Sequence, residues 1–201
     1  SLVGLKPTTG SLSRSGVVPI SSTLDTVGPM GRSVADVATL FNAMTGFDRE
    51  DLAMPLISED LQLIVRDTKL DNRRFGVLRT YSNDALYGRA LDLLSQNGFS
   101  LQEVEFQNER HARFSELLGA EMKRDLALYL DEHASDEISI DSIKSLQEFN
   151  SSDLENRAPY GQALVDLMVD LELTAGEVEK LAADVRHWGQ NYLDRLFMES
   201  G

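Results

Sequence analysis

The stretch VVPISSTLDTVGPMGRSVADVATLFNAMTG, residues 17–46, decides how the first part of the chain folds. Its second half predicts an amphipathic helix, because apolar residues recur there at helical spacing: Val34, Val37, Ala38, Leu40, Phe41 and Met44. Ser33 is placed to cap this helix, and Asp36 is favourably placed against the helix dipole. Gly46 is expected to end the helix in a left-handed conformation.

The residues before this helix are rich in turn formers. A strand-like opening, residues 1–5, runs into a turn at PTTG, residues 7–10. Ser13, Ser15 and Gly16 mark a second turn-rich stretch, and a loop with glycines and a proline at residues 28–31 follows. Downstream, the chain has the pattern of an amphipathic scaffold. We therefore expect the functional information to lie in the first 46 residues.

The composition limits the classes of function. The 201 residues are 42% hydrophobic, which is enough for one sizeable core. The net charge of −14 argues against a nucleic acid or an anionic membrane as partner, because phosphates would be repelled. The absence of cysteine excludes disulfides and thiolate metal sites. The three histidines lie far apart and show no metal-ligand spacing, so no metal site is expected.

The middle of the chain predicts a strand–helix–strand unit. A connector, residues 47–72, contains a proline and a charge run over 48–51 that is expected to be solvated. It leads to RFGVL, residues 74–78, which is typical of a strand. A helix over 83–96, stopped by Gly98, and a second strand over 99–106 follow. The two strands are expected to be parallel neighbours. No glycine-rich phosphate loop joins strand to helix, so nucleotide binding is not supported.

The remainder predicts helices. A long helix over 109–132 carries an apolar stripe, beside which Glu121 stands, while Asp125 is expected to be solvated. A short helix over 143–149 is expected to begin at Asp141, and residues 151–158 are expected to form a loop.

Two further helices are predicted at the end of the chain. Pro159 suits the first turn of one of them. Residues 174–177 form a capping box that opens a final helix reaching to about Met198.

Residues 4–46 resemble the second half of the amidase signature, the hallmark of serine hydrolases that cleave amide C–N bonds. GLKPT, SRSGVVP and DTVGPM occur in order at the expected spacing. The resemblance implies an α/β fold, of which this chain is an incomplete, helix-rich portion of a mixed-sheet structure. Residues 1–46 would be the second half of the signature core. Residues 47–201 would be the helical and βαβ remainder of the same domain, truncated at both ends.

The resemblance also implies where the chemistry lies. In the family the Ser–cis-Ser–Lys triad is upstream of GLKPT, so no catalytic residue is expected in this chain. Lys6 is not expected to act as the base, because nothing in the spacing shows the burial or the serine contact that a lysine base needs. Unpaired strand edges at the missing half would favour a homodimer or exchange of elements between chains.

Arg14 and Ser15 lie in the stretch that, by the resemblance, passes near the substrate cleft. The Arg14 guanidinium could hold a carboxylate or orient a loop; the alternative is a turn residue fixed by the neighbouring Gly16 and Pro19. Asp25 and Arg32 are expected to support the active site structurally. Asp25 would do so either by accepting loop amides or by pairing with Arg32.

A looser resemblance to the bacterial peptide-amidase-like branch is carried by Glu121–Met122–Lys123, Asp125–Leu126, Tyr129–Leu130, Leu146, Phe149–Asn150 and Tyr160–Gly161–Gln162. It implies that Phe149, Asn150, Tyr160 and Gln162 line or rim a substrate pocket. The alternative is that Phe149 and Tyr160 pack between helices.

The function that follows is an amidase that hydrolyses the carboxamide of a small molecule through an acyl-enzyme, without a cofactor and in the cytoplasm. One alternative is the glutaminase component of a glutamine amidotransferase, which would need partner subunits. Another is a non-catalytic binding or assembly module on the same scaffold.

Overall fold

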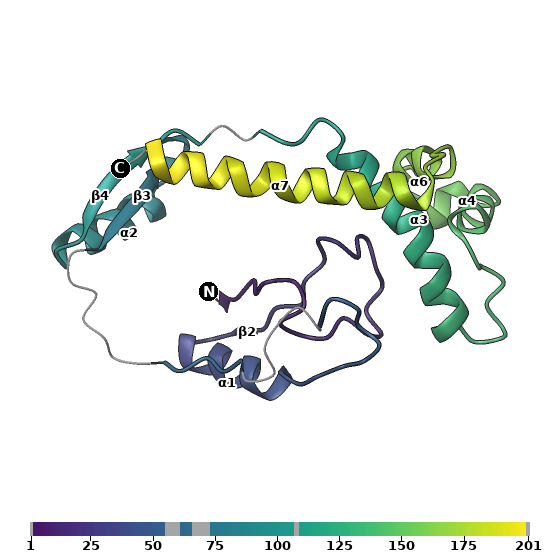
Figure 1. Cartoon of the computed structure of the whole chain (residues 1–201), viewed down its shortest axis with the longest axis horizontal. Coiled ribbons are helices and arrows are strands. Elements are labelled where there is room, and N and C mark those ends of the chain that lie inside the picture. The colour runs from purple at the N-terminus through teal and green to yellow at the C-terminus, as the bar shows by residue number, and fades with distance from the viewer. Residues whose placement is uncertain (1, 55–60, 66–72, 107–108, 200–201) are drawn as a thin grey trace. The chain divides into compact units, whose positions relative to one another are not determined.

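The computed structural model describes residues 2–54, 61–65, 73–106 and 109–199 (Figure 1). The chain forms two compact units, each built from two of its parts. The first unit combines Ser1–Val65 with Arg113–Ala182, and the second combines Arg66–Ala112 with Ala183–Gly201. Much of the expected connector falls outside the described residues. That residues 1–46 and 47–201 share one domain stays a prediction.

The first unit opens with a short antiparallel pair of strands. Strand β1, Val3–Gly4, pairs with β2, Met30–Gly31, and the amide of Leu5 donates to the carbonyl of Pro29 at 3.1 Å. This arrangement confirms the strand-like opening. Because the two strands pair, the two ends of the loop between them lie side by side, directly before the first helix.

Helix α1, Val34–Met44, confirms the predicted start and corrects the predicted end. The Ser33 hydroxyl accepts from the Asp36 amide, and the Asp36 carboxylate accepts from the Ser33 amide, both at 3.1 Å. The expectation for Gly46 is wrong, because Gly46 does not take a left-handed conformation. Thr45 ends the helix instead, with extended backbone and an amide that donates to the Phe41 carbonyl.

The other helices of the first unit pack on one another. Helix α3 contacts α4 and α6, and α4 contacts α5 and α6 (Figure 1); their bounds are Phe114–His133 (α3), Ile143–Ser151 (α4), Leu154–Arg157 (α5) and Ala163–Val169 (α6). Leu117 and Ile143 are fully buried here, as is Leu181 on helix α7, Ala175–Glu199. The Lys123 ammonium donates to the carbonyls of Val169 and Leu171, each at 2.8 Å, and so satisfies carbonyls at the C-terminal end of α6 and just after it.

Several predicted helix boundaries in this region are wrong. Helix α3 begins at Phe114 rather than at residue 109. The cap of α4 is Ser142, whose hydroxyl accepts from the Ser145 amide at 3.2 Å; Asp141 accepts from the hydroxyls of both serines instead. The expected loop over 151–158 contains α5.

The end of the chain corrects one expectation and confirms another. Pro159 lies in a turn completed by Gly161, at φ +83°, and α6 begins only at Ala163. The capping box at 174–177 is confirmed: the Thr174 amide and hydroxyl donate to the Glu177 carboxylate at 2.8 and 2.7 Å.

The second unit contains the predicted strand–helix–strand arrangement. Strands β3, Arg74–Leu78, and β4, Ser100–Val104, are parallel and in register, and α2, Ala85–Gln96, connects them. Gly98, at φ +82°, follows the helix as expected. The α/β fold class with a helix-rich content is thus confirmed. Among the described residues, no helix has both the length and the apolar character needed to cross a membrane.

Candidate functional site

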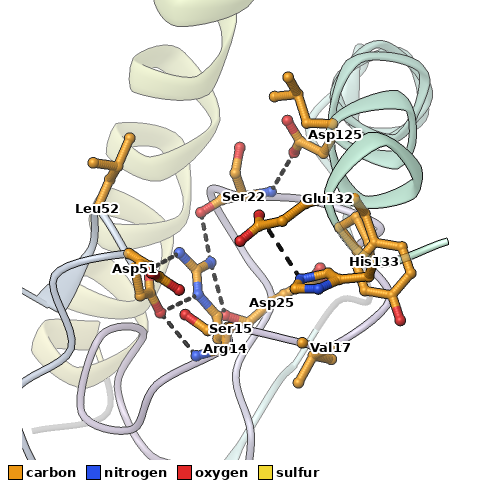
Figure 2. A pocket seen from close by; sticks show the side chains of 15 residues that line it. Arg14, Ser15, Val17, Ser22, Asp25, Asp51, Leu52, Asp125, Glu132 and His133 are labelled. Atoms are coloured by element: carbon orange, nitrogen blue, oxygen red, sulfur yellow. Dashed lines mark hydrogen bonds and ion pairs between the residues drawn. The ribbon is translucent and has the colours of Figure 1, made fainter. Parts of the chain in front are cut away.

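A pocket of about 290 Å³ lies in the first unit (Figure 2). Its wall comes from the loop over residues 14–25, from residues 50–52 and from the C-terminal half of α3, residues 125–133. We call residues 10–25 the signature loop, because they contain the SRSGVVP motif and the turn before DTVGPM. The pocket therefore joins the most distinctive part of the sequence to a helix about one hundred positions away.

The guanidinium of Arg14 donates hydrogen bonds to several groups of the protein itself. Its Nε and Nη2 donate to the two carboxylate oxygens of Asp51 at 3.0 and 2.7 Å, and its backbone amide donates to the same carboxylate at 3.0 Å (Figure 2). Nη1 donates to the carbonyls of Ser22, at 2.7 Å, and Asp25, at 3.4 Å. The carboxylate that the guanidinium holds belongs to the protein itself, at Asp51, and the placing of Arg14 and Ser15 in a substrate pocket stays a prediction. The guanidinium also orients the loop.

The ion pair is well buried, which makes it a strong constraint on the loop. The side chains of Arg14 and Asp51 are 14% and 3% exposed. The hydrogen bond from Arg14 lowers the pKa of Asp51, and the same contact raises the pKa of Arg14. Both groups are therefore charged at neutral pH. The expectation that the charge run over residues 48–51 is solvated is wrong for Asp51, which is buried, with 5% of the whole residue exposed.

Gly10 lets the signature loop approach residues 51–53. It has φ +83°, and a Cβ built on it would lie 2.4 Å from the carbonyl oxygen of Ala53. The Ala53 amide in turn donates to Asp51 at 3.0 Å. A side chain at position 10 would thus conflict with both the backbone conformation and the backbone of the segment that carries Asp51.

Ser15 lies at the pocket rim and donates its hydroxyl to Asp48 at 2.6 Å; Ser13 donates to the same carboxylate oxygen at 2.5 Å. These two hydroxyl groups lower the pKa of Asp48. Ser15 is therefore bound to an acceptor carboxylate in this structure. A serine that acts as a nucleophile needs a neighbouring base, and this arrangement does not provide one.

Asp25 braces the loop in the first of the two ways expected. Its carboxylate accepts from the amides of Ile20 and Ser21, both at 2.8 Å. The alternative pairing with Arg32 is wrong, because Arg32 is exposed and takes part in none of the ion pairs of the described residues. Asp25 lines the pocket, whereas Arg32 does not. Their support of an active site stays a prediction.

Glu121 and Asp125 of α3 hold the signature loop from the other side. Glu121 accepts from the hydroxyls of Ser21, Ser22 and Thr23, and Asp125 accepts from the Ser22 amide at 3.1 Å. The expectation that Asp125 is solvated is wrong, because its side chain is only 11% exposed. The sequence does show two carboxylates one helical turn apart, at Glu121 and Asp125. Nothing near them in the sequence indicates that they bind residues 21–23.

The four residues expected from the looser resemblance lie elsewhere in the first unit. None of Phe149, Asn150, Tyr160 and Gln162 lines this pocket. Phe149 lies under the Arg157 guanidinium at 3.8 Å, and the Gln162 amide donates to Ser151 at 2.9 Å. Packing of Tyr160 between helices is wrong, since its side chain is fully exposed. That these four residues rim a substrate pocket stays a prediction.

The arrangement as a whole suits binding and positioning. The hydroxyls of Ser15 and Ser22 donate to carboxylates, and the pocket wall also presents the apolar side chains of Val17, Leu52 and Leu128. Over the described part of the chain, no group of three or more His, Asp or Glu is arranged to hold a metal ion.

Comparison with known proteins agrees with the motifs. Residues 1–170 match the family model described as Amidase. A glutamyl-tRNA(Gln) amidotransferase subunit of Clostridium botulinum is 42% identical over 87 residues, which are 42% of this chain and 18% of that one. The corresponding protein of Zymomonas mobilis is 30% identical over 137 residues, covering 64% of this chain and 28% of its own length.

Solved structures match over most of the chain. An amidase family protein from Bacillus anthracis has a TM-score of 0.82 at 28% identity, covering 99% of this chain and 41% of that one. The peptide amidase from Stenotrophomonas maltophilia has a TM-score of 0.71 at 28% identity, covering 90% and 39%. The chain thus spans about two fifths of these structures, and less of the curated relatives. Because the family model matches well over half of its residues, the chain belongs to the amidase family.

Proposed function

We propose that this chain forms part of an amidase that hydrolyses a carboxamide C–N bond through an acyl-enzyme. The observation that carries the proposal is the match to the amidase family over residues 1–170, which includes the whole signature loop and its partner helix α3. In this proposal the nucleophile and its lysine base come from sequence outside this chain. The chain contributes a wall of the substrate pocket, and no cofactor takes part.

The pocket has a composition suited to a small amide substrate. Val17, Leu52 and Leu128 offer apolar contact, and Tyr129 adds an aromatic ring. Arg14 is already bound to Asp51, so its role is to shape this wall rather than to bind the substrate with a free guanidinium. The acyl or amine portion of the substrate would lie against the apolar side chains, with its amide group directed to the nucleophile.

The test is to express the complete open reading frame that contains this chain and to measure ammonia release from carboxamides. Peptides with a C-terminal carboxamide and simple aliphatic amides should be compared. We expect hydrolysis of at least one of the two groups by the complete protein, and none by the 201-residue chain alone. Hydrolysis by the chain alone would contradict the location of the nucleophile, and a complete protein that hydrolyses neither group would contradict the function.

A second candidate is the glutaminase component of an amidotransferase. The curated relatives named above are both subunits of glutamyl-tRNA(Gln) amidotransferases, which is the observation in its favour. Glutamine hydrolysis by the complete protein that appears only when a second protein is added would support this candidate. Hydrolysis of carboxamides by the isolated complete protein would instead support the free-standing amidase.

A further inference from the structure

We propose that Glu121 is a positioning residue for amide hydrolysis: from helix α3 it fixes the segment Ser21–Asp25, which forms one wall of the substrate pocket. The inference rests on the proposed amidase function, and it adds a residue to which the sequence motifs assign no role. Its basis is the set of contacts that this one buried carboxylate makes with residues about one hundred positions earlier in the chain.

The carboxylate is surrounded by donors from three consecutive residues. The Ser21 hydroxyl donates to Oε2, and the Thr23 amide donates to the same oxygen at 3.3 Å. The hydroxyls of Thr23 and Ser22 donate to Oε1 at 2.6 and 3.3 Å. Glu121 is 2% exposed and Ser21 is 0% exposed. A buried carboxyl group left without hydrogen-bond partners would cost folding free energy, so these contacts fix both partners.

The hydrogen bonds continue from Glu121 to the opposite wall of the pocket. Ser22 and Asp25 lie in the segment that Glu121 holds. Their carbonyl oxygens accept hydrogen bonds from the Arg14 guanidinium at 2.7 and 3.4 Å. Arg14 in turn binds Asp51 (Figure 2). The segment held by Glu121 therefore also fixes Arg14. A displacement of residues 21–25 would move both walls, and the pocket would lose its shape.

The chemistry of the site allows a conservative variant. In Glu121→Gln the amide oxygen can accept from the Ser21 hydroxyl and the Thr23 amide, while the NH₂ group donates to the Thr23 and Ser22 hydroxyl oxygens after these hydroxyls rotate. In Glu121→Leu no acceptor remains, and the donors of residues 21–23 are left without this partner. A positioning role therefore predicts that the Gln variant is close to wild type and that the Leu variant is not.

A matched control is available on the same helix. Glu116 is also a glutamate of α3, but its carboxylate pairs with Arg113 of the adjoining turn at 2.6 Å, and none of the hydrogen bonds or ion pairs found among the described residues joins it to the signature loop. Glu116→Gln and Glu116→Leu should leave the pocket unchanged. Differences between the two positions thus report contact with the loop rather than the loss of a carboxylate from α3.

The experiment uses the complete protein and two readouts. In Glu121→Leu we expect KM for a carboxamide to rise about tenfold, because residues 21–25 would then hold the arrangement that shapes the pocket only about a tenth of the time. Amide hydrogen exchange in a peptide covering residues 20–25 should accelerate by a similar factor. A purely structural role would lower the folded fraction, and hence the apparent kcat, with KM unchanged. Glu121→Gln should stay within about threefold of wild type for KM, because it retains the contacts.

The outcomes separate this inference from the function on which it rests. If the wild-type complete protein hydrolyses no amide, the proposed function fails, and hydrogen exchange alone then tests the clamp. Unchanged exchange over residues 20–25 in Glu121→Leu, or an unchanged KM in an active enzyme, would overturn the inference. If Glu121→Leu does not fold, the double variant Ser21→Ala/Thr23→Val replaces it: it removes two hydroxyl donors, and unchanged exchange and KM there would overturn the inference equally.

Discussion

The signature loop and the helical cluster of α3, α4 and α6 lie in the same compact unit but are held by different forces. The loop has little regular structure. Besides the apolar Leu12, which is 2% exposed, it is held by polar contacts to buried partners: Ser21, Asp51 and Glu121 are 0%, 5% and 2% exposed. The helices meet through buried apolar side chains, of which Leu117 and Ile143 are the best covered. The comparison teaches that one region depends on direction and charge, and the other on area and fit.

Removing the Asp51 carboxylate should have the largest effect, because it leaves the Arg14 guanidinium without its charged partner in a mostly buried position. We expect Asp51→Ala to lower the free energy of unfolding by about 3–5 kcal/mol. Urea unfolding of the complete protein measures this. Asp48→Ala is the control, since Asp48 also accepts hydroxyl hydrogen bonds from the loop but is only half-buried, and it should change stability far less. Equal effects would show that burial does not set the strength of these contacts.

Leu117→Ala should come next and act only on the helical cluster. Leu117 is fully buried, so the truncation removes apolar contacts and leaves a cavity. We expect a loss of about 3 kcal/mol. Leu164→Ala on α6 is the control, because Leu164 is 69% exposed. Hydrogen exchange over residues 20–25 should not change before global unfolding in Leu117→Ala. A local acceleration there would show that the cavity at Leu117 disturbs Glu121, one turn further along α3, and through it the signature loop.

The elements that the sequence could predict are those whose signals come from residues close together in the chain. Ser33, Gly98 and the box at 174–177 mark their elements through neighbours three or four residues away, and the structure confirms each. RFGVL forms the predicted strand; the run is short, as strands are, and polar residues bound it. Local signals of this kind fix most of the helices and both strands of the second unit.

Contacts between distant residues carry no such local signal. Arg14 lies 37 positions from Asp51, and Ser21 lies 100 positions from Glu121. Nothing near Asp51 or Asp125 distinguishes a buried acceptor from a solvated charge, so both looked like surface residues. The sequence therefore located the loop, including Arg14, Ser15 and Asp25, but not the carboxylates that hold Arg14 and the segment around Asp25. The expectations for Pro159 and Gly46 were wrong for a related reason. Each residue is compatible with a helix boundary, but Thr45 caps the end of α1 and α6 begins at Ala163.

Gly119→Ala should have a smaller effect, and it tests fit within the helical cluster. A Cβ at this position would lie 2.6 Å from Leu171 Cδ1 and 3.3 Å from Met168 Cγ. Leu171 Cδ1 is the far end of its side chain, Met168 Cγ lies midway along a flexible one, and alanine favours the helix, so we expect a net loss of about 1 kcal/mol. The double variant Gly119→Ala/Leu171→Ala should recover part of the overpacking cost in a double-mutant cycle. Additive losses would mean that Leu171 is not the residue that crowds position 119.

Moderate acidification should have the smallest effect on the unfolding free energy. It distinguishes the signature loop, which an ion pair holds, from the helical cluster, which apolar side chains hold. Arg14 lowers the pKa of Asp51 in the folded state, whereas an unfolded aspartate titrates at about 3.9. The stability that the ion pair contributes is thus fully present above about pH 4 and is lost as the pH falls through the folded pKa. The difference in unfolding free energy between wild type and Asp51→Asn should therefore be the same at pH 7 and pH 5 and should shrink only below about pH 4. The difference in unfolding free energy between wild type and Leu117→Ala should not depend on pH. It therefore serves as the control for the other carboxylates, which titrate in the same pH range in every variant. A wild-type advantage over Asp51→Asn that grew on acidification would contradict the sign of the pKa shift, and with it the view that charge holds the signature loop.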